Sequence, residues 1–296
     1  MVILMIIVIL GPTGVGKTKL SIELAKKLNG EIINGDSTQV YKEMNIGTAK
    51  VREEEKENIP HHLFSFKNVD EEYTVYEYQK DARNKIIKLK KQNKIPIIVG
   101  GSNLYLSALL YDYKFNDEEK SIKELSLTNE EIYNKLITKH PNINIDCHNR
   151  QRLIRAYNKY IINNEEYATP SKMTMIYSDV ILIGLTTDRE KLYNIINIRV
   201  DKMIEDGLLN EVKTLLDKYG ETKELKTAIG YKELINYFNN QMALEEAIDL
   251  IKKNSRHYAK RQYTWLNNKM DVNWFQVNFI NFDTTVKEVL DFIEKR

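Results

Sequence analysis

Apolar runs recur along the chain at intervals that suit a parallel sheet. The first run, residues 1–10, is wholly apolar and rich in β-branched side chains, and it ends at Gly11-Pro12. A continuous run of this kind is typical of a central parallel strand that is covered on both faces. Shorter strand-like runs, separated by segments long enough for crossover helices, follow at residues 32–33, 95–99 and 180–185. The pattern therefore predicts an α/β fold in which helices flank a parallel sheet.

Helical periodicity fills most of the chain between these runs. Residues 17–28 repeat apolar side chains at helical spacing. Residues 117–164 are polar and helical in spacing, with no strand-like run among them, which predicts a helical insertion into the α/β fold. From Arg189 onward the chain is again mostly amphipathic helix, and we expect a last strand near residues 274–279 and a terminal helix at 286–293.

These patterns predict two domains, an α/β core formed by residues 1–115 and 178–296 and a helical insertion formed by residues 116–177. The chain has 296 residues, of which 42% are hydrophobic, so it can bury one large core or two modest ones. The same composition excludes disordered and collagen-like proteins.

Charge and cysteine content narrow the class further. The 44 Lys and Arg residues nearly balance 42 Asp and Glu, for a net charge of +2, so any nucleic-acid surface must be local. A single cysteine, Cys147, excludes an intramolecular disulfide and indicates a reducing compartment. The apolar run at residues 1–10 is about half as long as a membrane span and lacks the basic start of a signal peptide. We therefore expect a cytoplasmic protein without membrane association.

A glycine-rich motif connects the first strand to the first helix. It matches G-x-x-x-x-G-K-[ST], and its residues are Gly11, Pro12, Thr13, Gly14, Val15, Gly16, Lys17 and Thr18. Glycines let successive backbone N–H groups close around phosphate oxygens, a lysine neutralises their charge, and a hydroxyl group binds magnesium. The motif therefore predicts a phosphate-binding loop of the P-loop NTPase type. The one metal we expect is Mg²⁺, held by Thr18 and the phosphates.

Two further strand ends carry candidate chemistry. Asp36 follows the strand at 32–33, at the edge where such sheets bind ligands, and it is a candidate general base or else a carboxylate that caps a turn. The strand at 95–99 ends in Gly100-Gly101-Ser102, without the acidic residue that nucleoside-triphosphate hydrolases usually place at such a strand end. Since the strand at 95–99 does not end in an acidic residue, Asp36 is the carboxylate at this edge, and it could serve as a base.

Other short motifs have simpler explanations. Asn268-Lys269-Met270-Asp271 and Asp217-Lys218-Tyr219-Gly220 match guanine-nucleotide motifs, but neither follows a convincing strand, so we interpret both as accidental. His61-His62, and His148 beside Cys147, do not have the spacing of metal ligands. We interpret these histidines as structural or polar-contact residues.

Basic charge is concentrated in two segments of helical spacing. Residues 252–270 contain six Lys and Arg residues and no acid, with one stripe formed by Lys252, Arg256, Lys260 and Tyr263. A second stripe without acids is formed by Arg152, Arg155 and Lys159. With aromatic side chains interleaved, such stripes are typical of an RNA contact surface, and a solvated helix face with core aromatics is the alternative.

Together these motifs resemble the tRNA dimethylallyltransferase family, also called tRNA isopentenyltransferase or the IPP transferase family. The resemblance spans nearly the whole chain. Besides the glycine-rich motif, it is carried by residues 36–41 (DSTQVY), 47–50 (GTAK), 60–63 (PHHL), 100–105 (GGSNLY), 151–156 (QRLIRA), 207–212 (GLLNEV), 228–233 (AIGYKE) and 258–265 (YAKRQYTW). A colinear set of this kind is far more specific than a P-loop alone.

The resemblance implies a reaction and a role for each catalytic residue. The exocyclic amine (N6) of the adenosine 3′ of the anticodon, in tRNAs reading codons that begin with U, attacks dimethylallyl diphosphate and releases pyrophosphate. Asp36 is expected to accept the proton of the amine. Lys17, Thr18 with Mg²⁺ and Arg199 are expected to stabilise the departing pyrophosphate, and Ser102 to orient the base or the amine.

The resemblance also implies tRNA as a partner, with the adenosine flipped out of its stack and the insertion at residues 116–177 on the anticodon stem. The expected tRNA contacts are Asp36, Ser37, Thr38, Gln39, Ser102, Gln151, Arg152, Leu153, Ile154, Arg155, Gly230, Tyr231, Lys232, Arg256, Lys260 and Arg261. We expect the protein to act as a monomer.

The chain departs from the family pattern in three places. Cys147-His148-Asn149 replaces the usual Pro-Asn-Asp, Tyr157-Asn158 replaces Leu-Glu, and the insertion is shorter by roughly twenty residues. Asn149 still suits the N-cap of the following helix. Three alternatives stay open at this point: an adenylate isopentenyltransferase acting on free nucleotides, a P-loop kinase, and an RNA-binding module that senses nucleotide without catalysis.

Overall fold

The computed structural model describes residues 5–113, 126–165 and 174–296. The chain folds into two compact units, Met1–Tyr111 with Met175–Arg296, and Asp112–Thr174. The strands, all in the first unit, are β1 (Ile6–Leu10), β2 (Gly30–Asn34), β3 (His61–His62), β4 (Ile95–Val99), β5 (Val180–Thr186) and β6 (Asn273–Gln276). The helices of this unit are α1 (Lys17–Leu28), η1 (Glu54–Lys56), α2 (Val75–Lys91), α3 (Asn103–Leu110), α6 (Arg189–Glu205), α7 (Leu208–Tyr219), α8 (Lys223–Thr227), α9 (Tyr231–Phe238), α10 (Leu244–Lys269) and α11 (Phe282–Glu294).

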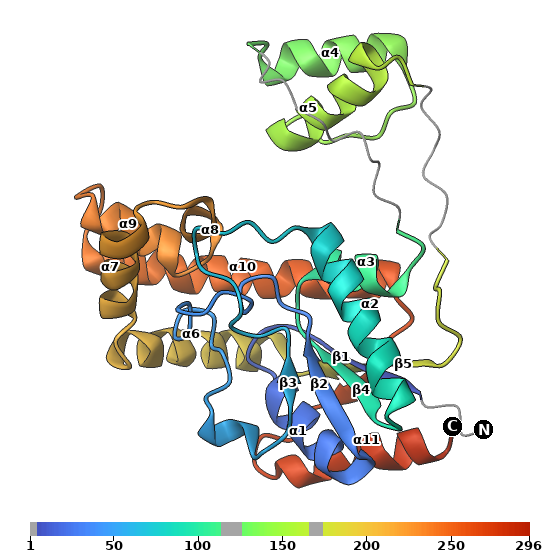
Figure 1. Cartoon of the computed structure of the whole chain (residues 1–296). Helices are drawn as coiled ribbons and strands as arrows, with labels where there is room; N and C mark the ends of the chain where they lie inside the picture. Colours follow the sequence, from blue (N-terminus) through green and yellow to red (C-terminus); the bar gives the residue numbers. More distant parts are fainter. Residues whose placement is uncertain (1–4, 114–125, 166–173) are drawn as a thin grey trace. The chain divides into compact units, whose positions relative to one another are not determined.

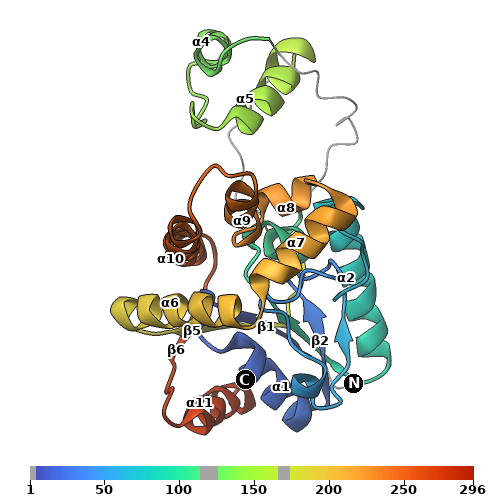
Figure 2. The same ribbon diagram turned by 90° about the vertical axis from the view of Figure 1, so that its left-hand side faces the viewer.

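One parallel sheet organises the first unit. Its strand order is β3-β2-β4-β1-β5-β6, and each pair of neighbours is parallel. α2 and α3 cover one face of the sheet, while α1 and α11 lie side by side on the other (Figures 1 and 2). The predicted fold class, a parallel sheet flanked by helices, is therefore confirmed.

The central strand β1 explains the apolar run at the start of the chain. Ile6, Val8 and Leu10 pack into the core beneath α2, α3 and α10, whereas Ile7 and Ile9 pack into the opposite core with α1 and α11. All five side chains are fully buried. A strand covered on both faces needs apolar residues at every position, which the continuous run provides.

Most element bounds follow the hydrophobic pattern. The expected helix at 17–28 and strand at 95–99 coincide with α1 and β4, and the expected strand at 180–185 is β5 with one residue more. β1 begins at Ile6, and residues 1–4 of the expected first strand lie outside the described residues.

The expected strand near 274–279 is wrong at its carboxyl end. β6 ends at Gln276, and α11 begins at Phe282, before the predicted start of the terminal helix. The reason is a turn around Asn278, whose Oδ1 accepts hydrogen bonds from the N–H groups of Ile280 and Asn281 at 3.1 and 2.9 Å. Such side-chain to backbone bonds compete with strand pairing and end the strand early.

The second unit contains α4 (Asn129–Lys139), α5 (Arg150–Tyr157) and a π-helical turn, η2 (Asn158–Ile162). Its own small core includes Ile132, Leu136 and Leu153. Asn149 caps α5, as expected, because its Oδ1 accepts from the N–H of Arg152 at 3.1 Å. The insertion is therefore helical where the structure describes it. Across both units, the described helices include none that is long and apolar enough to cross a membrane.

Gly11 lies directly after β1, where the fold leaves no room for a side chain. Its φ is +129°, and an added Cβ would lie 2.4 Å from the carbonyl oxygen of Leu185 on β5. Gly207 also has a positive φ, +100°, but nothing lies within 4 Å of its added Cβ. A substitution at Gly207 would therefore cause backbone strain alone, whereas one at Gly11 would cause both backbone strain and steric overlap.

We predict that Gly207→Ala lowers the free energy of unfolding by about 1–2 kcal/mol, the cost of the left-handed backbone. Gly11→Ala should lower it by about 1–3 kcal/mol more, because strands β1 and β5 must also move apart. Urea denaturation of both variants measures the difference. Equal losses for the two variants would contradict the close approach of β1 to β5.

Candidate active site at the carboxyl edge of the sheet

The glycine-rich loop leaves β1 and opens α1. Gly14 and Gly16 have φ values of +90° and +91°, a conformation that suits glycine. Gly16 is also the N-cap residue of α1, so the loop ends at the positive end of a helix dipole. The sequence motif predicted a phosphate-binding loop, and this loop has the geometry that such binding needs. Its backbone N–H groups and the N-terminus of α1 both attract anions.

Lys17 turns its side chain back onto the loop. Its Nζ donates to the carbonyl oxygens of Gly11 and Pro12 at 2.9 and 2.8 Å. Burial and, after it, the neighbouring Arg199 lower the pKa of Lys17 to about 8, and Asp36 partly opposes the shift. The ammonium group is thus poorly solvated, and a bound anion would stabilise its charged form.

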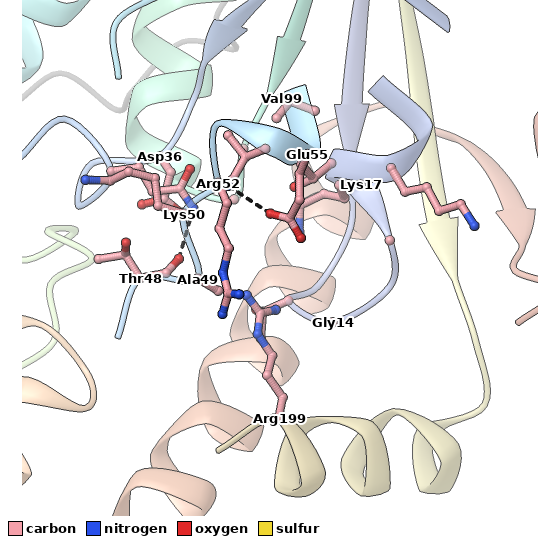
Figure 3. Close-up of a pocket in the computed structure, with 18 of the residues that line it drawn as sticks. Gly14, Lys17, Asp36, Thr48, Ala49, Lys50, Arg52, Glu55, Val99 and Arg199 are labelled. Atoms are coloured by element: carbon pink, nitrogen blue, oxygen red, sulfur yellow. Dashed lines mark hydrogen bonds between the residues drawn. The ribbon is translucent and has the colours of Figure 1, made fainter. Parts of the chain in front are cut away.

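Arg199 enters the same region from α6 (Figure 3). Its guanidinium donates to Oγ1 of Thr13 at 3.0 Å. Burial lowers the pKa of Arg199, and Asp36 opposes this shift as well. The charge of one carboxylate, Asp36, therefore opposes the lowering of the pKa of both cations, which come from separate elements.

Asp36 follows β2, and its neighbours hold it in a tight turn. Its Oδ1 accepts from the N–H of Thr38 at 2.9 Å and from the Thr38 hydroxyl at 2.7 Å. The side chain of Asn34 brackets the turn, accepting from the Asp36 N–H at 2.8 Å and donating to the Asp36 carbonyl at 2.9 Å. One carboxylate oxygen thus caps the turn, as the simpler interpretation expected, and no donor among the described residues reaches the other.

Ser102 connects the ends of β4 and β2. Its Oγ accepts from the N–H of Ser37 at 2.9 Å and lies 3.1 Å from the Ser37 hydroxyl. Its own N–H donates to the carbonyl of Gly35 at 3.2 Å. The hydroxyl of Ser102 therefore supports the turn that carries Asp36.

A cavity of about 750 Å³ is lined by Lys17, Arg199 and Asp36, whereas Ser102 is not among its lining residues. The predicted site residues that line it are Thr13, Gly14, Gly16, Lys17, Thr18, Asp36, Gln39 and Arg199. In Figure 3, Asp36, Thr48 and Lys50 lie on one side of the cavity and Arg199 reaches in from another. An anion-binding end and a carboxylate therefore share one cavity.

The cavity wall at residues 45–50 depends on a residue that the sequence did not single out. Both carboxylate oxygens of Glu211, on α7, accept from the N–H groups of Asn45, Ile46 and Gly47 at 2.8–3.2 Å. Tyr231 adds its hydroxyl to Glu211 at 2.6 Å. Glu211 stands in a motif quoted for the resemblance, but its pairing with a loop 164–166 positions away is visible only in the fold.

Lys50 is a second cavity residue that the sequence did not single out. Its Nζ donates to Oδ1 of Asn45 at 3.0 Å and to the carbonyl of Tyr41. Burial lowers the pKa of Lys50 to about 8, and Glu211 partly opposes the shift. Gln39 ties the same loop to the Asp36 turn, because its Nε2 donates to the carbonyl of Thr48 at 2.9 Å.

The side chains of two predicted tRNA contacts, Tyr231 and Leu153, are buried in this structure. Tyr231, the first residue of α9, is fully buried, with its ring against Gly47 and its hydroxyl on Glu211 of α7. Leu153 is fully buried in the core of the insertion. In each case an apolar surface that belongs to a helix packs inward, so these side chains shape the fold rather than meet a ligand.

Only some side chains of the basic segment on α10 are exposed, because others bond to neighbouring elements. Lys252 forms an ion pair with Asp201 at 2.5 Å, and Arg256 donates to Asn197 at 2.5 Å, both on α6. Tyr263 bonds the hydroxyl of Thr186 on β5 at 2.5 Å. Lys260 and Arg261 are exposed, as are Gln151, Arg152 and Arg155 on α5.

The remaining sequence motifs fall outside the cavity. Gly230 and Lys232 do not line it, and Lys232 lies 3.6 Å from the carboxylate of Glu233. The guanine-nucleotide matches fall at the ends of α10 and α7 rather than after strands, in line with the sequence pattern around them.

The fold and the site together define a P-loop protein with the layout of a group-transfer enzyme: one end of the cavity suits a phosphate chain, and a carboxylate faces the same space. A family model described as IPP transferase matches residues 39–269. The chain therefore belongs to the IPP transferase family, as the sequence motifs indicated.

Individual relatives agree over nearly the full length. The tRNA dimethylallyltransferase of Anoxybacillus flavithermus is 47% identical, and the match covers 98% of this chain and 96% of the relative. The tRNA dimethylallyltransferase of Staphylococcus haemolyticus is 42% identical, with 98% and 92% covered.

Solved structures give the same result. The crystal structure of a tRNA isopentenylpyrophosphate transferase from Staphylococcus epidermidis has a TM-score of 0.76 and 40% identity, covering 98% of this chain and 99% of that one. A eukaryotic dimethylallyltransferase solved acting on tRNA has a TM-score of 0.80 and 32% identity, covering 98% and 80%.

We predict that the affinity for inorganic pyrophosphate falls as pH rises through about 8, where Lys17 loses its charge. Bound anion favours the charged form, so the affinity is highest below that pH. Calorimetric titration from pH 6.5 to 9.5 measures the effect. Lys17→Arg is the control, because arginine keeps its charge and the ratio of the two dissociation constants cancels the titration of the ligand. A ratio independent of pH would contradict the prediction.

Proposed function

We propose that this protein transfers a dimethylallyl group from dimethylallyl diphosphate to the exocyclic amine of the adenosine 3′ of the anticodon in tRNAs that read codons beginning with U. The observation that carries the proposal is the shared cavity, with Lys17 and Arg199 at an anion-binding loop and Asp36 in the same space. The names of the relatives support tRNA and a prenyl diphosphate as the substrates.

In this reaction the adenine nitrogen forms a bond to the first carbon of the dimethylallyl group while the carbon–oxygen bond to the diphosphate breaks. The electron pair of the broken bond leaves with pyrophosphate, and the amine gives up one proton. Asp36 accepts that proton on the oxygen that its turn does not use. Lys17, Arg199 and the loop N–H groups stabilise the charge on the leaving pyrophosphate.

A divalent metal fits this arrangement through one protein ligand. Thr18 is exposed and lines the cavity at the start of α1, where a hydroxyl group can bind Mg²⁺ together with diphosphate oxygens. When bound, the ion would supply further positive charge at the leaving group. Ser102 contributes by holding the Asp36 turn through Ser37.

We propose tRNA contacts on each of the two units. Lys260 and Arg261 offer exposed positive charge on α10, and Gln151, Arg152 and Arg155 form the corresponding exposed polar and basic face on α5 of the insertion. Phosphate contacts of this kind position an RNA without reading its sequence. We propose that one chain carries the whole set of reacting residues and acts as a monomer.

The deciding experiment incubates the purified protein with Mg²⁺, dimethylallyl diphosphate and an unmodified tRNA carrying adenosine 3′ of its anticodon, followed by nucleoside mass spectrometry. Prenylated adenosine is the expected product. Prenylated AMP without prenylated tRNA would assign the chain to adenylate isopentenyltransferases instead. ATP turnover with a small acceptor, and no prenyl transfer, would assign it to the kinases.

We predict that Asp36→Ala lowers the transfer rate by about 10²–10⁴-fold, the usual contribution of a general base. Its tRNA affinity should stay within about threefold of wild type, because the carboxylate acts on the amine and not on the phosphates. Single-turnover rates and filter binding measure the two quantities. Asp249→Ala, an exposed position on α10, is the matched control. A fully active Asp36→Ala protein would remove Asp36 from the mechanism.

We also predict that Arg152→Ala and Lys260→Ala each weaken tRNA binding and reduce the salt dependence of log Kd by about one unit. Pyrophosphate affinity should not change in either variant. Binding measured from about 50 to 300 mM salt gives the slope, and Lys135→Ala, an exposed position on α4, serves as the control. Unchanged slopes would show that these helices do not contact the RNA backbone.

A further inference from the structure

Two loops with different tasks meet at the carboxyl edge of the sheet. The glycine-rich loop follows β1, and the loop at Gly100-Gly101-Ser102 follows β4. Gln262, on α10, lies between them. Its Oε1 accepts from the N–H of Thr13 at 3.1 Å, and its Nε2 donates to the carbonyl of Gly101 at 3.0 Å. The side chain is 2% exposed, so no solvent competes for either bond.

The contact at Gly101 is close. An added Cβ there would lie 2.1 Å from Nε2 of Gln262. Tyr258, one turn earlier on the same face of α10, also donates its hydroxyl to the Gly101 carbonyl at 3.1 Å. Gln262 and Tyr258 both line the cavity described above. Helix α10 therefore holds the Gly101 loop with two donors, and of these two side chains Gln262 is the one that extends to the phosphate loop.

Each end of the amide leads to one of the reacting groups. On one side, Thr13 receives Arg199 on its hydroxyl and precedes Gly14 in the loop that would hold the diphosphate. On the other side, Ser102 follows Gly101 and accepts from the N–H of Ser37, which follows Asp36. Gln262 thus connects the glycine-rich loop with the loop whose Ser102 supports the Asp36 turn.

A neutral amide supplies the hydrogen-bonding groups that both loops use. The Thr13 N–H requires an acceptor and the Gly101 carbonyl requires a donor, and glutamine offers one of each. An apolar side chain would leave the Thr13 N–H unpaired and the Gly101 carbonyl with the Tyr258 hydroxyl as its remaining donor. A carboxylate would place negative charge against a carbonyl oxygen.

We propose that Gln262 is a positioning residue that sets the separation between the diphosphate-binding loop and the Asp36 carboxylate. The inference rests on the proposed prenyl transfer and adds a residue that acts on the reacting geometry without touching the substrates' reacting atoms. A change in this separation affects the step in which bonds form and break, where a misplacement of about 1 Å costs about 10²-fold. The binding of either substrate alone uses only one of the two loops and should change little.

The test compares Gln262→Met, Gln262→Glu and wild type in single-turnover prenyl transfer, with separate dissociation constants for tRNA and for inorganic pyrophosphate. For Gln262→Met we expect the transfer rate at saturation to fall by about 10–100-fold. Both dissociation constants should stay within about threefold of wild type. Gln241→Met and Gln241→Glu, at an exposed position outside the cavity, make the same chemical changes and should be fully active.

Gln262→Glu adds a signature that a merely structural role does not produce. Protonation turns the buried carboxyl into a donor for Gly101, so its rate relative to wild type should rise as pH falls from about 8 to about 5.5. Asp36, Lys17, Arg199 and Tyr258 also line the cavity, so each rate is expressed relative to that of wild type at the same pH. The corresponding ratio for Gln262→Met should not depend on pH.

The outcomes separate this inference from the function on which it rests. If wild type and the Gln241 variants do not prenylate tRNA, the proposed function is wrong. If they do, and Gln262→Met keeps the wild-type rate, Gln262 is not a positioning residue. A loss that is confined to the two dissociation constants would overturn the inference as well. A pH-independent ratio for Gln262→Glu would also overturn it.

Discussion

The close approach of strand ends at the carboxyl edge of the sheet brings together the loops that form the site. An added Cβ on Gly100 would lie 2.1 Å from the carbonyl carbon of Gly35, and one on Gly11 would lie 2.4 Å from the carbonyl oxygen of Leu185. Side chains at these points would separate β2 from β4 and β1 from β5. Glycine is required there for steric reasons, and the loops that follow can then reach one another.

Charge at this edge follows from the same packing. Lys17 and Arg199 come from different elements, and burial lowers the pKa of each. Asp36 is the carboxylate that opposes both shifts, and it sits in a turn that leaves it one oxygen for other partners. A ligand that carries a diphosphate would bring negative charge to these poorly solvated cations. The electrostatic attraction between them would be stronger here than in water. The cavity therefore favours a phosphate chain at one end and a proton donor at the other.

The helices beyond the sheet hold the walls of the cavity. Glu211 on α7 binds three consecutive backbone N–H groups of the loop at residues 45–47, and Gln262 on α10 binds the loops after β1 and β4. Glu211 does not contact the glycine-rich loop, and Gln262 contacts it through a neutral amide. Their effect is to replace loop flexibility with fixed hydrogen bonds, which is how an enzyme keeps reacting groups in register.

Local patterns alone determined the α/β class, the bounds of α1 and β4, the glycine-rich loop and the cap at Asn149, because each depends on neighbours within a few residues. The family motifs also predicted that Asp36, Ser102 and Arg199 share one site; in the structure Asp36 and Arg199 line the cavity, and Ser102 bonds to Ser37 beside Asp36. Sequence could not show that Tyr231 and Leu153 point inward, that Arg256 turns to α6, or that Glu211 and Gln262 support the cavity. Most of those outcomes depend on hydrogen bonds between residues 59–249 positions apart, and only the packing of helices on the sheet brings such residues together.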